Sequence, residues 1–117
     1  MTTNRDIESV IDIYHYGQSI VSFVSGMNQQ EFVNDQKTIA AVMYGIAVMG
    51  EATKRLSDNF RKQHPELPWR ELAGLRDRLV HDYKNIDLDI LWDVVSVEIP
   101  ALLVSLEPLL PKQDESV

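Results

Sequence analysis

The chain has 117 residues, and its 11 basic and 18 acidic residues give it a formal net charge of −7. This length suits one domain and excludes barrel and doubly wound enzymes, which need roughly 200 residues or more. The absence of cysteine excludes disulfides, thiolate metal sites and a cysteine nucleophile. No apolar run approaches the ~20 residues that span a bilayer, and the start lacks a signal-peptide pattern, so we expect a cytoplasmic protein without membrane contact.

Apolar residues recur at helical spacing from the beginning of the chain. Their steps of three, four and seven predict a first helix over about residues 4–25, which Gly26 ends. Asn28 and Glu31 form the capping pattern of a short helical turn. Asp35 can cap a second long helix, whose apolar stripe runs to Leu56.

The middle of the chain is more broken. Ser57 can cap a further short helical piece, and residues 64–69 form a connector because both of their prolines lack an amide donor. Pro68 suits the first position of a third long helix that runs to Tyr83. Asn85 could then close this helix in the left-handed conformation.

The last long helix is predicted to begin at the capping residue Asp87 and to continue to Leu106, with a kink at Pro100. We see no convincing strand. The predicted fold class is therefore all-α, an up-and-down bundle of four main helices plus short helical pieces over residues 1–110, followed by a flexible polar tail over 111–117. Apolar residues surround much of the last helix, and a monomer would expose some of them, so we expect a homodimer.

The most informative stretch for chemistry is residues 74–83. On a helix, Arg76 and Tyr83 lie nearly in line, because they are seven residues apart. Asp77 and His81 share a second face, where a carboxylate can hold an imidazole. One helix therefore presents a phosphate-binding cation, a titratable imidazole, an orienting carboxylate and a phenol.

This set of groups suits cleavage of an RNA phosphodiester without a metal. The 2′-hydroxyl attacks the adjacent phosphorus, so the site needs a group such as His81 to move a proton near neutral pH. It also needs a fixed positive charge on the pentavalent phosphorane, which the Arg76 guanidinium supplies. Asp77 would bias the imidazole tautomer, and the expected product carries a 2′,3′-cyclic phosphate. The spacing alone also fits a helix on which the histidine is structural.

The surrounding residues carry a resemblance to a known family. The run 75–83, followed by Ile86 and Asp87, resembles the Arg-x4-His-x-Tyr signature of the HepT-like ribonuclease toxins of the HEPN superfamily. Gly50-Glu51-Ala52 resembles the Gly-Glu-Ala element of the same family, and the resemblance covers nearly the whole chain. The chain departs from the family at 84–85, where an aromatic residue and glycine are frequent.

The resemblance implies a fold, an activity and a partner. HepT-like proteins are helical homodimers whose active-site helices meet across the two-fold axis, and they act as metal-independent RNases in toxin–antitoxin pairs. Carried onto this sequence, the resemblance makes Arg76 and His81 the catalytic pair. It makes Tyr83 the phenol that receives AMP from ATP through a nucleotidyltransferase antitoxin of the MntA type. AMP on Tyr83 would occupy the position of RNA beside Arg76.

Other charged side chains could support the site. Glu51 could hold Arg76, or it could pair with Lys54 or Arg55 as a solvated residue. Arg78 can pair with Asp82 along the helix. The candidates for RNA contact, each of which could also be an ordinary surface charge, are Arg78, Lys84, Lys54 and Arg55, with Arg61, Lys62 and Arg70 as further members of the same rim.

We expect neither a cofactor nor a metal. The chain has no glycine-rich phosphate loop, and no histidine stands at ligand spacing from Asp87, Asp89 and Asp93. An alternative function is a non-catalytic helical module that binds or positions substrate for a nucleotidyltransferase partner. Such a module has no need to keep both Arg76 and His81.

Overall fold

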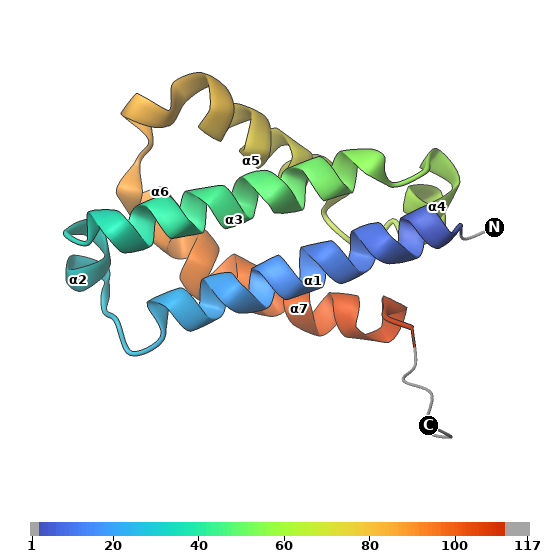
Figure 1. Cartoon of the computed structure of the whole chain (residues 1–117), viewed down its shortest axis with the longest axis horizontal. Helices are drawn as coiled ribbons and strands as arrows, with labels where there is room; N and C mark the ends of the chain where they lie inside the picture. Colours follow the sequence, from blue (N-terminus) through green and yellow to red (C-terminus); the bar gives the residue numbers. More distant parts are fainter. Residues whose placement is uncertain (1–2, 112–117) are drawn as a thin grey trace.

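The computed structural model describes residues 3–111, apart from the side chains of residues 80–83. Over this range the chain is helical and contains no strand, which confirms the all-α class (Figure 1). The residues 112–117, which make up most of the predicted tail, lie outside the described residues. No helix in the described range is both long and apolar enough to cross a membrane.

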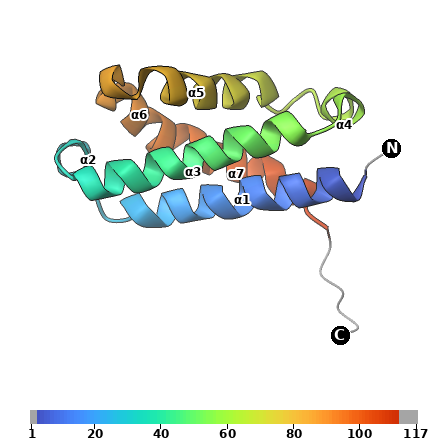
Figure 2. The ribbon, with the colours of Figure 1, turned by 45° about the horizontal axis from the view of Figure 1, so that its top comes forward.

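Four long helical segments make up the bundle. They are α1 (Asn4–Val24), α3 (Gln36–Arg55), α5 (Trp69–Asp82) and a continuous run of α6 (Leu88–Asp93), η2 (Val94–Glu98) and α7 (Ile99–Leu106). The short pieces between and after them are α2 (Gln29–Val33), α4 (Asp58–Gln63), η1 (Tyr83–Asn85) and η3 (Glu107–Leu109). The helix α3 lies between α1 and α5, and α7 packs against α1 (Figure 2).

The core is built from the apolar stripes that the periodicity predicts. Ile13 and Ile20 of α1 are fully buried, as are Phe32 and Leu106. The ring of Phe32 lies 5.3 Å from that of Trp92, centroid to centroid, and joins α2 to α6. The long segments thus share one core, and α3 contributes to both sides of it because it packs against α1 and α5.

The predicted capping residues begin their helices as expected. Asn28 accepts a hydrogen bond from the Glu31 amide at 2.8 Å, and the Glu31 carboxylate accepts one in return from the Asn28 amide at 3.0 Å. Asp35, Ser57 and Asp87 cap α3, α4 and α6. These side-chain oxygens satisfy amides that have no partner within the first turn of a helix.

Three details of the second half differ from the prediction. Pro68 precedes α5, whose first bond runs from the Leu72 amide to the Pro68 carbonyl, so it caps the helix rather than occupying its first position. Asn85 is not left-handed, since positive φ among the described residues occurs only at Gly26. The chain tightens instead into the 3-10 turn η1 after Asp82.

The irregularity in the last helix lies just before Pro100, in η2, which is a π-helical turn. There the Ile99 amide donates to the Val94 carbonyl, five residues back. Pro100 has no amide hydrogen and cannot continue the α-helical bonding, so a wider turn at this point lets the helix continue through α7.

Candidate active site

The guanidinium of Arg76 is at the centre of the candidate site, where α5 packs against α3. A Cβ atom at position 50 would overlap the Cβ atom of Arg76 and would lie 2.7 Å from its Cγ atom and 3.1 Å from the Leu72 carbonyl oxygen. Only glycine fits at position 50 with α5 at this distance. Gly50 therefore determines how closely the stem of Arg76 lies against α3.

Two carboxylates hold the Arg76 guanidinium. Its Nη2 atom lies 3.3 Å from the Glu51 carboxylate, and its Nη1 atom donates a hydrogen bond of 3.2 Å to Asp77. Asp77 also accepts a hydrogen bond from the Lys54 ammonium at 2.5 Å. The four side chains form an alternating chain of charges across α3 and α5, and 27% of the Arg76 side-chain surface stays exposed. The guanidinium is thus oriented but still open to an anion.

The carboxyl group of Asp77 has a lowered pKa. The hydrogen bond from Lys54 is the largest cause and the hydrogen bond from Arg76 a smaller one, while partial burial acts in the opposite direction. Asp77 is therefore ionised at neutral pH and orients Arg76 and Lys54. The contact predicted between Asp77 and His81 involves a side chain outside the described part of the structure.

The backbone places the other motif residues on α5 or directly after it. His81 lies on α5, five residues after Arg76, which is about 7.5 Å along the helix axis. Tyr83 begins η1, directly after α5 ends. The side chains of both residues, like that of Asp82, are outside the described range, so the predicted pair between Arg78 and Asp82 is as well.

The remaining predicted contact residues separate into different places. Lys54 belongs to the site through Asp77. Arg55 faces Asp12 of α1, with 3.8 Å between their charged atoms. Lys84 is exposed in η1. Among the side chains that the structure describes, Lys54 is the one of these four candidates that contacts the charges around Arg76.

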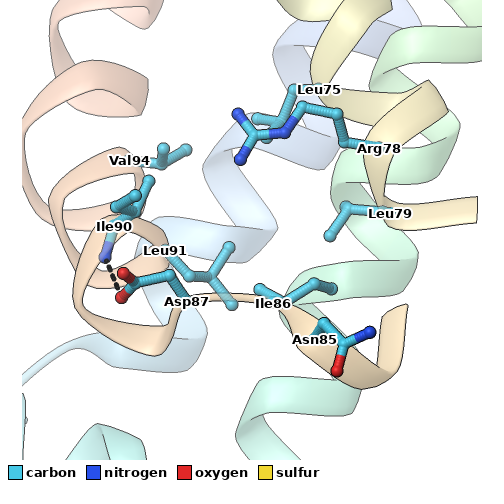
Figure 3. Close-up of a pocket in the computed structure, with 9 residues that line it drawn as sticks. All are labelled: Leu75, Arg78, Leu79, Asn85, Ile86, Asp87, Ile90, Leu91 and Val94. Carbon is cyan, nitrogen blue, oxygen red and sulfur yellow. Dashed lines mark hydrogen bonds between the residues drawn. The ribbon is translucent and has the colours of Figure 1, made fainter. Parts of the chain in front are cut away.

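Arg78 extends over a pocket between α5 and α6 that is lined mainly by apolar residues (Figure 3). Asp87 lies on the far side of this pocket and accepts hydrogen bonds from the amides of Asp89 and Ile90, as the cap of α6. The other residues that line the pocket are Leu75, Leu79, Asn85, Ile86, Ile90, Leu91 and Val94. Arg78 thus faces a different side of α5 from Arg76.

Basic residues are concentrated in the segment that contains α4 and α5, a feature that the motif residues alone do not reveal. Eight of the eleven basic residues lie between Lys54 and Lys84, together with five of the eighteen acidic residues. This segment has a net charge of +3, and the remaining chain has a net charge of −10. A count of charge by segment would have revealed this concentration from the sequence. The described residues include no group of three or more acidic or histidine side chains that could hold a metal ion.

Comparison with known proteins gives a consistent result. The family model described as "Ribonuclease HepT-like" matches residues 13–109. The chain is 34% identical to "Putative RNase MJ0125" of Methanocaldococcus jannaschii over 95% of this chain and 97% of that protein. It is 38% identical to "Probable ribonuclease HepT" of Thermococcus cleftensis over 84% of this chain and 89% of that protein. No solved structure matches the chain.

The family model and the archaeal relatives cover most of the chain, and the matched range includes both the Gly50-Glu51-Ala52 element and the whole of α5. The fold that the structure shows is the helical fold that the motif resemblance implies. The chain therefore belongs to the HepT-like ribonuclease family, of the HEPN type.

Proposed function

We propose that this chain is a metal-independent endoribonuclease toxin in which Arg76 and His81 carry the reaction. The observation that carries the proposal is the position of Arg76: the base of its side chain packs against Gly50, its guanidinium lies between two carboxylates, and the side chain stays partly exposed. The family, whose relatives are named as RNases, supports the same activity.

In the proposed reaction, the 2′-oxygen of the substrate attacks the adjacent phosphorus and the bond to the 5′-oxygen breaks. His81 acts as acid or base for the protons that leave the 2′-oxygen and reach the 5′-oxygen. Arg76 has five N–H donors, so its contacts with Glu51 and Asp77 leave donors for the phosphorane oxygens. The products are a 2′,3′-cyclic phosphate and a free 5′-hydroxyl.

Cleavage of RNA by purified variants tests the proposal. Arg76→Ala should lower kcat by about 10²- to 10³-fold, as is typical when a group that stabilises transition-state charge is lost. His81→Ala should lower kcat by about 10²- to 10⁴-fold. Arg5→Ala, which removes an exposed arginine of α1, is the matched control and should keep full activity. Equal cleavage by all four proteins would eliminate the enzyme and favour the non-catalytic module.

We further propose that a nucleotidyltransferase antitoxin of the MntA type inhibits the toxin by transferring AMP to Tyr83. The position of Tyr83, directly after the helix that carries Arg76 and His81, supports this regulation because the AMP phosphate would compete with RNA for the guanidinium. With the partner and ATP, the wild type should gain the mass of one or more AMP groups, and Tyr83→Phe should gain none. Tyr44→Phe, which changes an exposed tyrosine of α3, should be modified like the wild type.

The proposed toxin is a homodimer. In the bundle as described, several large apolar side chains remain exposed, among them Tyr44, Val97 and Val104. Contiguous exposed apolar surface is typical of an interface. A two-fold axis beside α5 would bring two copies of the Arg76 and His81 motif to one cleft, as the resemblance implies.

A further inference from the structure

An open groove lies between α4 and the first half of α5, next to the candidate active site. Its α4 side is formed by Asp58, Arg61 and Lys62, and its α5 side by one face of that helix between Trp69 and Asp77. The remaining lining residues are Pro65, Trp69, Arg70, Ala73 and Gly74. One end of this α4–α5 groove lies at Asp77, whose carboxylate accepts a hydrogen bond from the guanidinium that we propose to bind the cleaved phosphate.

The groove presents two cations that carboxylates do not neutralise. Its acidic residues are already paired, Asp58 with Arg61 at 3.0 Å and Asp77 with Lys54 and Arg76. Lys62 and Arg70 are exposed, and neither forms an ion pair with another residue in the described part of the chain. An anion that enters the groove therefore meets two positive charges in a protein with a net charge of −7.

The floor of the groove suits a sugar–phosphate backbone better than stacked bases. The Trp69 side chain is buried, and its indole Nε1 donates to the His64 carbonyl at 2.9 Å, so its ring is not a stacking platform. Ala73 and Gly74 have no long side chain, so a ligand can approach the backbone of α5 closely at this point. A Cβ atom at position 74 would contact nothing within 4 Å. Binding without an aromatic platform depends on phosphate contacts and carries little sequence information.

The spacing along α5 fits a single strand. Arg70 and Arg76 are six residues apart, which is about 9 Å along the helix axis and about 120° around it, so the long arginine side chains must lean toward each other to contact one strand. A stacked strand rises about 3.4 Å per nucleotide, so this distance corresponds to between two and three nucleotides. A strand whose cleaved phosphate contacts Arg76 could therefore place a neighbouring phosphate near Arg70.

We propose that the α4–α5 groove binds single-stranded RNA through its phosphates, two or three nucleotides from the cleaved bond, with Lys62 and Arg70 as the contacts. The inference rests on the proposed function, because the distance of two or three nucleotides is counted from the phosphate that Arg76 would bind. It assigns to Lys62 and Arg70 a role in substrate binding that is separate from the chemical step.

Binding of a strand that cannot be cleaved tests the groove independently of catalysis. The probe is a fluorescein-labelled 2′-O-methyl uridine 12-mer, which has no free 2′-hydroxyl, and its Kd is measured by anisotropy from 50 to 200 mM NaCl. The Lys62→Ala/Arg70→Ala double variant should raise Kd about tenfold or more at the lowest salt. The slope of log affinity against log salt should become shallower by about 1.4, since each lost contact to a single strand removes about 0.7.

The matched control compares single variants with one another. Lys37→Ala removes an exposed lysine near the start of α3, the end of that helix that lies far from Lys54 and α4 (Figure 1). It changes the net charge by the same amount as Lys62→Ala or Arg70→Ala and should leave both Kd and the salt slope unchanged. If the three single variants bind the probe equally, the groove does not bind RNA.

Cleavage of a uridine 12-mer separates this inference from the proposed function. The double variant should raise KM and leave kcat within about twofold, because the groove acts before the chemical step. If the wild type does not cleave RNA but the double variant loses probe binding, the proposed function is wrong and the proposal that the groove binds RNA stands. If the wild type cleaves RNA and the double variant has unchanged Kd and KM, only the proposal that the groove binds RNA is wrong.

Discussion

At the scale of single residues, the position of Arg76 depends on the absence of a side chain at Gly50. The atoms that a Cβ at position 50 would meet are the Cβ and Cγ of Arg76 and a backbone oxygen, which cannot move unless α5 moves. Gly50→Ala should therefore cost about 1–3 kcal/mol of stability, the usual range for overpacking. It should also lower RNA cleavage beyond the effect of reduced stability, because Arg76 shifts away from Glu51. Urea unfolding and kcat measured well below the unfolding midpoint check both effects.

Two other glycines of the bundle serve as controls for this prediction. At Gly17, a Cβ would lie 2.7 Å from a terminal methyl group of Leu103, which can rotate away, so Gly17→Ala should cost less than Gly50→Ala. At Gly74, the space is open within the chain, and Gly74→Ala should raise stability by about 1 kcal/mol through helix propensity. If Gly50→Ala proves as stable as Gly17→Ala, the close approach of α3 and α5 does not determine the site.

At the scale of elements, the start of α1 is joined to the start of α4 by one buried carboxylate. Asp6 is 1% exposed, and it accepts hydrogen bonds from the Ser57 amide at 2.8 Å, the Ser57 hydroxyl at 2.9 Å and the Thr3 amide at 3.2 Å. Burial raises the pKa of Asp6, but the hydrogen bonds from Ser57 and Thr3 outweigh it, so the pKa is below its ordinary value. The ionised carboxylate thus holds two helix ends together.

This network makes stability depend on pH in a defined direction. A pKa that is lower in the folded than in the unfolded chain adds stability above about pH 4, and this contribution is lost as the pH falls through the folded-state pKa. Asp6→Asn should therefore lower stability by about 2 kcal/mol at pH 7, and the difference from the wild type should shrink below pH 4. Urea unfolding of both proteins between pH 7 and pH 3 measures this difference in the free energy of unfolding.

The exposed carboxylate of Asp12, on the same helix, provides the matched control. Its nearest cation is Arg55, at 3.8 Å, and surface pairs of this kind contribute little. Asp12→Asn should change stability by less than about 1 kcal/mol at neutral pH. A difference between Asp6→Asn and the wild type that stays constant from pH 7 to pH 3 would contradict the proposed role of the Asp6 charge.

Helix boundaries were predictable where the signal is local. The capping oxygens of Asn28, Asp35 and Asp87 act on amides two or three residues away, so the sequence contains all of the interaction. The π-helical turn before Pro100 was expected only as a kink. Pro100 accounts for an interruption at this point, but the sequence does not specify that it takes the form of a π-helical turn in which Val94 and Val95 are both buried.

At the scale of the whole molecule, the same distinction explains which part of the candidate site could be predicted. The spacing within α5 identifies Arg76 and His81 as residues of one helix. The contact between Arg76 and Glu51 joins two helices. The sequence left open whether Glu51 holds Arg76 or pairs with Lys54 or Arg55, and the packing of α3 against α5 gives it Arg76 as its partner. The hydrogen bond between Lys54 and Asp77 could not be predicted from α5 alone, because α3 supplies the cation. The contact that the spacing predicts between Asp77 and His81 stays a prediction, since the His81 side chain is outside the described residues.

The outer surface of the last helical segment carries an apolar stripe. Val97, Ala101, Val104 and Pro108 are all exposed and follow steps of four, three and four residues, so they lie along one face of η2, α7 and η3. Val97 is 62% exposed and Val104 71%. Other apolar residues of this segment, such as Val95 and Leu102, lie on the opposite face and are buried in the core. A stripe at this spacing is typical of a helix that packs against another helix.

We therefore expect that this stripe belongs to the homodimer interface, together with the surface beside α5, and that a second copy of the chain covers it. Sedimentation equilibrium at tens of micromolar should give twice the 13.4 kDa of one chain. Val97→Glu/Val104→Glu should halve this mass, because two buried carboxylates face an apolar partner surface. Ser105→Glu places the same charge at an exposed neighbouring position and should leave the dimer intact. If the double variant remains dimeric, the stripe is not part of the interface. A monomeric wild type would contradict the expectation of a dimer.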